Sequence, residues 1–172
     1  MKKLALTCAA VTLAMTGLLV SPAHADSGLF RIFNADLDES TGDCLDSSTG
    51  DVISIECNDK AGKRESGWQL WRISFVDNVP GLVMFENVKY PGRCLAGRGT
   101  GSNGVVLAGC TVADSSQWWW RQSVNFPVSQ SITSYVGNYL LYDEVGTLDV
   151  RLAPSVNPYG RAQWVISPGS LT

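Results

Sequence analysis

The chain has 172 residues, of which 45% are hydrophobic and 17% charged, and its formal net charge is −3. This composition is typical of a folded chain, and the length fits one domain of about 150 residues. The single histidine, His24, lies in a segment that we expect to be removed. Catalysis by Ser-His-Asp or Cys-His groups and most catalytic zinc sites are therefore excluded.

Residues 1–25 have the features of a secretory signal peptide. Lys2 and Lys3 form a basic start, residues 4–20 are apolar, and Ala23-His24-Ala25 has the small-x-small form of a cleavage site. The apolar run is short for a membrane span of about 20 residues, which argues against an anchor. We expect cleavage before Asp26 and secretion, with a bacterial type of signal.

The expected mature chain, residues 26–172, is acidic. Cleavage removes two lysines and no acidic residue, so the net charge goes from −3 to −5. The mature chain has no cluster of Lys and Arg. Such a chain is a poor candidate for binding nucleic acid or an anionic membrane, and no second segment is apolar and long enough to span a bilayer.

The mature chain retains four cysteines, Cys44, Cys57, Cys94 and Cys110. Four cysteines allow three pairings, and an oxidising compartment favours structural disulfides. A metal site is the alternative, but there is no Cys-x-x-Cys spacing and no histidine. The separations of 13 and 16 residues favour local pairs, Cys44–Cys57 and Cys94–Cys110.

Short groups of apolar residues, broken by Gly, Pro, Asn and Asp, predict many short strands. These strands fall into three repeats at about residues 26–75, 76–124 and 125–172. The first repeat has Gly42-Asp43-Cys44-Leu45-Asp46, then a second cysteine at position 57, and it ends at Gln69-Leu70-Trp71.

The second repeat has the same order of motifs. Gly92-Arg93-Cys94-Leu95-Ala96 is followed by Cys110 and then by Gln117-Trp118-Trp119. The third repeat has changed: we align Gly137-Asn138-Tyr139-Leu140-Leu141 with Gly-x-Cys-Leu and Ala153 with the second cysteine. Its Gln163 and Trp164 are adjacent rather than one apart.

Three units of about 50 residues, with about four strands each, predict a closed threefold assembly, because one unit alone could not bury its apolar face. We expect the closing tryptophans Trp71, Trp119 and Trp164 to meet near the pseudo-threefold axis. First-strand residues would join them there: Ile32, Phe85, and either Thr133 or Tyr135.

With Gly-x-Cys-Leu, a second cysteine and Gln-x-Trp occurring twice in order, the chain resembles the ricin B-type β-trefoil family over essentially all of its mature length. The resemblance implies an all-β β-trefoil. It also implies up to three shallow sugar pockets, each with a carboxylate, a stacking aromatic ring and an amide.

The resemblance places the most complete pocket in the first repeat, with Asp46 as the carboxylate and Gln69 as the amide. Ile55 stands at the aromatic position, so Trp68 would supply a ring from another direction. Gln69 and Gln117 could instead bond to backbone within their repeats, and Asp46 could cap a turn.

The other two pockets have lost more of the pattern. Ala96 and Ala108 replace the carboxylate and the aromatic residue of the second repeat. In the third, our alignment puts Leu141 and Arg151 at these positions, while Tyr142 and Asp143 could form a displaced pocket.

The run Trp118-Trp119-Trp120 predicts an interaction surface, because neighbours in a strand point to opposite faces. If Trp119 points inward, Trp118 and Trp120 point outward, unless loops cover them. Exposed tryptophan is enriched at interface hot spots and also stacks on sugars.

Residues 36–51 contain six carboxylates, and their start faintly resembles a calcium loop. The expected glycine is displaced and position twelve is Ser47, so we expect a solvated acidic loop and no metal or other cofactor. No two carboxylates are placed across a cleft, so the chain is not expected to be a glycosidase or another enzyme.

We therefore expect a secreted lectin-like protein that binds a glycan or glycoprotein. The alternative is a protein-interaction subunit of a secreted assembly, as in the trefoil subunits of cytolethal distending toxins. A trefoil protease inhibitor is a third possibility, but the ricin-type motifs argue against it.

Overall fold

The computed structural model describes residues 28–34, 43–58, 67–76, 79–101, 104–125, 129–144, 147–154 and 162–169. The expected signal peptide and the first half of the acidic segment lie outside these residues. Among the residues described, no helix has the length and apolar character needed to cross a membrane.

The described part of the chain contains twelve strands and one short 3₁₀ helix. In chain order they are β1 (Leu29–Asn34), β2 (Asp43–Asp46), β3 (Ile53–Glu56), β4 (Trp71–Phe75), β5 (Leu82–Asn87), β6 (Arg93–Gly97), β7 (Val105–Gly109), η1 (Ser115–Gln117), β8 (Trp119–Asn125), β9 (Ser129–Ser134), β10 (Tyr139–Asp143), β11 (Val150–Pro154) and β12 (Trp164–Gly169).

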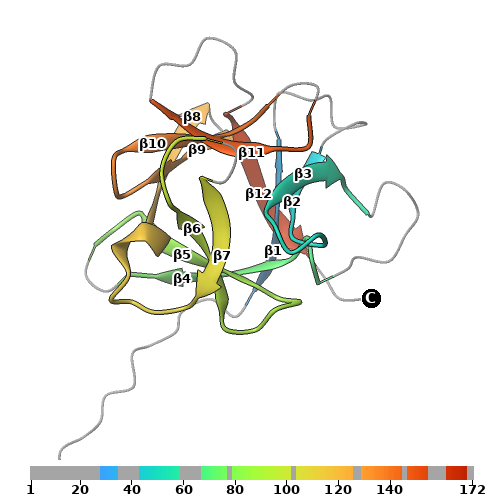
Figure 1. The fold of residues 1–172 in the computed structure, drawn as a ribbon, viewed down its shortest axis with the longest axis horizontal. Coiled ribbons are helices and arrows are strands. Elements are labelled where there is room, and N and C mark those ends of the chain that lie inside the picture. Colours follow the sequence, from blue (N-terminus) through green and yellow to red (C-terminus); the bar gives the residue numbers. More distant parts are fainter. Residues whose placement is uncertain are drawn as a thin grey trace, which may run out of the picture.

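Six of the strands close into a barrel. Antiparallel pairing runs from β1 to β4, β5, β8, β9 and β12, and β12 pairs again with β1. The other six strands form the hairpins β2–β3, β6–β7 and β10–β11. Figure 1 shows these hairpins at the right, the left and the top of the molecule, around the barrel strands. A six-stranded barrel with three hairpins is a β-trefoil, so the predicted fold is confirmed.

The core lies between the barrel and the hairpins and is centred on three tryptophans. Trp71, Trp119 and Trp164 have no exposed surface. The indole N–H of each donates a hydrogen bond to the carbonyl oxygen of a leucine in its own repeat. These pairs are Trp71 with Leu45 at 3.1 Å, Trp119 with Leu95 at 3.0 Å, and Trp164 with Leu141 at 2.9 Å.

The tryptophan–leucine bonds correct our alignment of the third repeat by one residue. Since Leu141 is equivalent to Leu45 and Leu95, Leu140 and not Tyr139 occupies the first-cysteine position. Asn138 then takes the place of Gly92, and both have a positive φ, of 53° and 77°. Asn tolerates this conformation better than most side chains do, so Asn138 can begin the hairpin without a glycine.

The strand pairs of the hairpins extend this correction to β11. Ile55 faces Cys44 and Ala108 faces Cys94, whereas Ala153 faces Leu140. Ala153 is therefore at the aromatic position, not at the second-cysteine position, which falls on residue 155, outside the described part of the chain.

The first-strand core residue of the third repeat is Ile132, so the prediction of Thr133 or Tyr135 was wrong. Ile132 belongs to the same buried cluster as Ile32 and Phe85, and all three have no exposed surface. Thr133 is buried on the opposite face of β9, and Tyr135 is 45% exposed.

Both predicted disulfides are present, Cys44–Cys57 and Cys94–Cys110. Each joins the first strand of a hairpin to the residue just after its second strand. In the chain-entropy model each contributes about 3 kcal/mol by restricting the unfolded chain.

Candidate functional site

Gln69, one of the residues predicted to bind sugar, forms hydrogen bonds to the backbone on both sides of Cys57. We call this arrangement a glutamine bracket. The Oε1 of Gln69 accepts a hydrogen bond from the backbone N–H of Asn58 at 2.8 Å, and its Nε2 donates to the carbonyl oxygen of Glu56 at 3.1 Å. These two residues flank Cys57. Gln69 is 2% exposed. Both ends of its amide are therefore engaged with backbone, and the side chain ties the β3 end to the start of β4.

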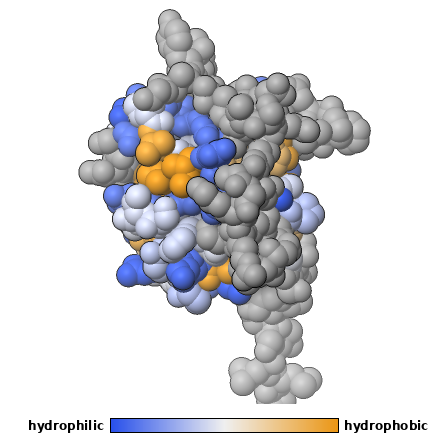
Figure 2. Space-filling view, turned by 90° about the vertical axis from the view of Figure 1, so that its right-hand side faces the viewer, coloured by the Kyte–Doolittle hydropathy of each residue, from blue (hydrophilic) through white to orange (hydrophobic). Residues whose placement is uncertain are grey.

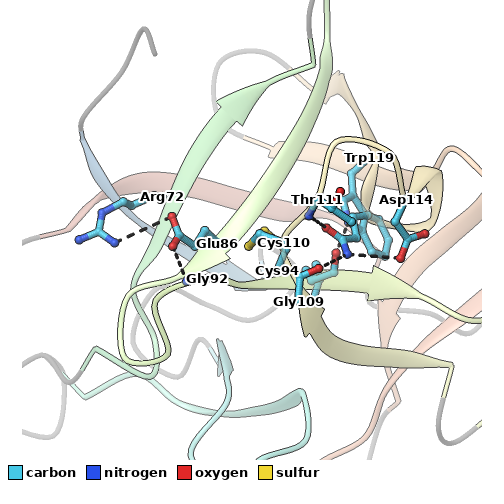
Figure 3. Close-up of a disulfide and its surroundings, with 11 residues drawn as sticks. Arg72, Glu86, Gly92, Cys94, Gly109, Cys110, Thr111, Asp114 and Trp119 are labelled. Carbon is cyan, nitrogen blue, oxygen red and sulfur yellow. Dashed lines mark hydrogen bonds and ion pairs between the residues drawn. A yellow bond between two sulfur atoms is a disulfide. The ribbon is translucent and has the colours of Figure 1, made fainter. Parts of the chain in front are cut away.

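Gln117 makes the same bracket in the second repeat. Its Oε1 accepts from the N–H of Thr111 at 3.0 Å, and its Nε2 donates to the carbonyl of Gly109 at 2.7 Å. Figure 3 shows Gly109, Thr111 and Asp114 gathered on one side of the Cys94–Cys110 disulfide. The glutamine of Gln-x-Trp thus holds the second cysteine in place, while the tryptophan holds the leucine beside the first.

Asp46 lies at the end of β2 and is 1% exposed. Its Oδ1 accepts a hydrogen bond from the backbone N–H of Ser48, so it does cap the following turn. Within the described part of the chain, Oδ2 has no hydrogen-bond partner. One oxygen of this carboxylate is therefore committed to the fold, and the side chain is almost entirely buried.

Trp68, which stands just before the bracket glutamine, is brought close to the end of β2. The Ser47 hydroxyl donates to the Trp68 carbonyl at 3.2 Å. The ring is half-buried, and the ammonium of Lys89 lies 5.0 Å from its centroid, a cation–π distance. Trp68 is therefore held beside Ser47 at the end of β2 by its backbone and packs against Lys89 through its ring.

The surface on the side of the β2–β3 hairpin contains both apolar and hydrophilic residues. Figure 2 views the face that lies at the right of Figure 1, where the β2–β3 hairpin is found. Orange apolar areas lie on this face as small separate groups among hydrophilic residues.

In the second repeat, the position equivalent to Asp46 is occupied by Ala96, which is fully buried and has no polar side-chain group. In the third repeat the corrected alignment puts Tyr142 there, in place of Leu141. Tyr142 is half-buried, and Asp143 beside it is 2% exposed.

The charged groups near Tyr142 neutralise one another. Arg151 lies opposite it on β11 and forms ion pairs with Glu144 at 2.7 Å and Asp149 at 3.0 Å. The hydrogen bond to Asp149 raises the pKa of Arg151, and the charge of Glu144 adds to this effect. The charges of Arg151, Glu144 and Asp149 are therefore largely paired with one another.

The tryptophan run behaves as strand alternation predicts when Trp119 points inward. Trp118 and Trp120 lie on the opposite side, half-buried, and pack over a small apolar cluster that includes Leu82 and Met84. The ring centroids of Trp118 and Tyr135 are 5.1 Å apart, in an edge-to-face arrangement. Trp120 and Tyr135 are 6.2 Å apart. We call Trp118, Trp120 and Tyr135 the aromatic cluster.

The described residues include no group of three or more His, Cys, Asp or Glu side chains able to hold a metal ion. Asp36, Asp38 and Glu39 of the acidic segment lie outside them, so the faint calcium-loop pattern is not covered by this finding.

No protein-family model matches the chain, and no curated protein sequence does. The fold does match solved structures. The designed threefold-symmetric protein ThreeFoil is 14% identical, with a TM-score of 0.62 over 81% of this chain and 97% of that one. The cytolethal distending toxin of Haemophilus ducreyi is 14% identical, with a TM-score of 0.63 over 85% and 86%.

A lectin is also among the matches. The Polyporus squamosus lectin, solved with a sialylated trisaccharide epitope, is 18% identical, with a TM-score of 0.60 over 82% of this chain and 49% of that one. At these identities the likeness establishes the fold alone. The chain is a β-trefoil that shares its architecture with lectins and with components of a bacterial toxin.

Proposed function

We propose that this protein is a secreted, non-enzymatic lectin-like module that binds carbohydrate through the first repeat, with Asp46 and Trp68 as its contact residues. The observation that carries the proposal is the presence of a carboxylate and a half-buried indole ring, Asp46 and Trp68, on two segments that the Ser47–Trp68 hydrogen bond joins.

This arrangement supplies two of the interactions that sugars require. An ionised carboxylate accepts hydrogen bonds from hydroxyl groups, and Oδ2 of Asp46 would do so here. An indole face packs against the apolar side of a pyranose ring. Gln69 contributes by holding the segment that carries Trp68, rather than through a free amide.

Two further observations support a lectin-like role outside the cell. Structural neighbours include proteins solved with bound saccharides. Two disulfides tie the hairpins of this chain, and structural disulfides persist in oxidising compartments. The signal-peptide pattern at residues 1–25 points in the same direction.

The test is a glycan array with the purified protein, both disulfides intact, beside the Asp46→Asn variant. Asparagine keeps an oxygen that can cap the turn and removes the charge. The matched control is Asp51→Asn, since Asp51 is exposed near the same hairpin. We expect binding to fall at least tenfold in Asp46→Asn and to stay unchanged in the control. Binding that survives Asp46→Asn would rule out this site.

A second candidate is a protein-interaction subunit of a secreted assembly, and the aromatic cluster favours it. Tyr135 and Val136 are 45% and 48% exposed beside the two half-buried indoles. Aromatic side chains of this kind are enriched at interface hot spots. Toxin components from Haemophilus ducreyi and Actinobacillus actinomycetemcomitans also share the fold.

This second function is tested by affinity capture from the producer's own culture medium, followed by titration of the partner that is identified. Tyr135→Ser and Trp120→Ala should each weaken binding by about 2 kcal/mol, the scale of a hot spot. Phe75→Ser, at an exposed aromatic residue outside the cluster, is the control. Unchanged affinity in both cluster variants would remove the cluster from the interface.

A further inference from the structure

The threefold pattern of the chain defines sets of equivalent positions on the barrel strands. Side chains two apart on a strand share a face. The residues two after the core tryptophans are therefore equivalent: Ile73, Arg121 and Ile166. The residues two before Ile32, Phe85 and Ile132 are likewise equivalent: Phe30, Val83 and Gln130.

Four of these six inward-facing positions are apolar, and the two polar ones lie on neighbouring strands. Arg121 is on β8 and Gln130 is on β9, which pair with each other. The Nε of Arg121 donates a hydrogen bond to Oε1 of Gln130 at 2.9 Å. At these positions β8 and β9 thus depart from the apolar pattern of the other four barrel strands, and their two polar side chains bond to each other.

These two residues line a pocket of about 290 Å³, together with Phe75, Gly81 and Val83. Phe75 ends β4 and is 54% exposed, so it forms an apolar rim. The backbone N–H of Arg121 donates to the Gly81 carbonyl at 3.0 Å, which fixes β8 against the segment leading into β5. The pocket therefore combines a positioned guanidinium with an aromatic wall.

Arg121 has no carboxylate partner among the described residues, unlike three other arginines of the chain. Arg72, Arg98 and Arg151 each lie within 4.0 Å of an acidic side chain. Partial burial of Arg121 lowers its pKa, but a guanidinium stays charged in proteins. A half-buried charge without a counter-ion is costly, so an anion entering the pocket would gain a stabilising partner.

We infer that this pocket binds a small organic carboxylate that has an apolar face. Since Gln130 engages Nε, the Nη groups of Arg121 would donate in parallel to the two carboxylate oxygens, the bidentate geometry that favours arginine for such ligands. The ring of Phe75 would pack against the apolar face. A volume near 290 Å³ is at the small end of ligand pockets, so ligands with a single ring are the size to test.

This site is independent of the sugar site proposed above, and it extends the function rather than restating it. The carboxylate could belong to an aromatic acid or to an acidic sugar. Benzoate and D-glucuronate are probes for these two sources, and benzamide and D-glucose are their neutral counterparts.

The test is calorimetric titration of the full protein with the four probes. We expect at least one carboxylate to bind with a dissociation constant of about 1 mM. Its neutral counterpart should bind at least tenfold more weakly. Tighter benzoate would assign the pocket to aromatic acids, and tighter glucuronate to acidic sugars.

The decisive variant is Arg121→Ile, which gives β8 the residue that the other two repeats have at this position. It should keep the fold and lose carboxylate binding at least tenfold, and Asp46→Asn should leave that binding unchanged. Should Arg121→Ile fail to fold, Arg121→Gln removes the charge with a polar side chain. Equal binding of acid and neutral probe, undiminished binding in the variant, or no binding of either acid at 50 mM would each overturn the inference.

Discussion

The indole N–H of Trp164 donates a 2.9 Å hydrogen bond to the carbonyl oxygen of Leu141. Both residues are fully buried. This bond aligns the closing strand β12 with the hairpin β10–β11, in a repeat that has a hydrophobic residue in place of its first cysteine. It therefore identifies the equivalent residues of the third repeat more reliably than the sequence motifs do.

Trp164→Phe should lower the free energy of unfolding by about 2–4 kcal/mol. The change leaves the Leu141 carbonyl unpaired in the core and opens a small void. Urea unfolding measures the loss, and Trp120→Phe, at a half-buried indole, is the matched control. A loss no greater than that of the control would show that the bond does not define the repeat.

Gln69→Leu should destabilise the fold by about 2 kcal/mol, because a side chain of similar size leaves the Asn58 N–H and the Glu56 carbonyl without their partner. Gln122→Leu, on an exposed face of β8, should change the unfolding free energy by less than about 0.5 kcal/mol. Chemical denaturation of both variants checks the difference, and equal effects would contradict a structural bracket.

Asn138→Ala should cost about 1 kcal/mol of stability, because alanine at φ 53° is strained in the left-handed region. Asn138→Gly should be neutral or stabilising, since glycine adopts that region freely. Thermal unfolding of the two variants tests the order. An alanine variant as stable as the glycine variant would show that the turn relaxes.

The stability that Asp114 contributes should disappear below about pH 4. Hydrogen bonds from the hydroxyl and the backbone N–H of Ser116 hold the pKa of the Asp114 carboxyl below its usual value, and Arg98 adds to this. A lowered pKa in the folded state stabilises above the unfolded pKa of about 3.9 and is lost as the pH falls through the folded value.

Unfolding of the parent and of Asp114→Asn at pH 5 and pH 2.5 tests this linkage. The parent should be the more stable protein at pH 5, and the gap should narrow at pH 2.5. A gap that is the same at both values would mean that ionisation of Asp114 does not contribute to stability.

The fold was predictable because its main contacts are encoded in pairs of nearby motifs. Cys44 and Cys57, and likewise Cys94 and Cys110, close short loops, and Gln69 and Trp71 bond to the two ends of such a loop. Each motif therefore specifies contacts within its own repeat, which a repeat alignment can find without knowledge of the barrel.

The third repeat was predicted less accurately for a physical reason. Asn138 can adopt the conformation of Gly92, so a glycine search selects Gly137 and moves the alignment by one residue. The first-strand core residue of this repeat was also misplaced, at Thr133 or Tyr135 in place of Ile132.

Strand alternation alone could not decide between Ile132 and its neighbours Thr133 and Tyr135, because alternation does not say which face of β9 meets the barrel interior.

The Arg121 pocket was also missed. Its signal was present, since counting two residues from each core tryptophan gives Ile73, Arg121 and Ile166. That comparison needs the correct core positions on every closing strand. Likewise, the convergence of Trp68 and Lys89 depends on contacts between segments that no spacing rule connects.

Barrel closure has a consequence for the order in which the chain can mature. The pairing of β1 with β12 extends over six residue pairs, from Leu29 with Gly169 to Asn34 with Trp164. Strand β1 is made early on the ribosome but receives this partner only after residue 169 has been synthesised. Contacts between such distant segments slow folding, because the loop between them must first be closed. Closure of the barrel by β1 and β12 therefore depends on contacts between distant segments of the chain, which form more slowly than the local hairpins.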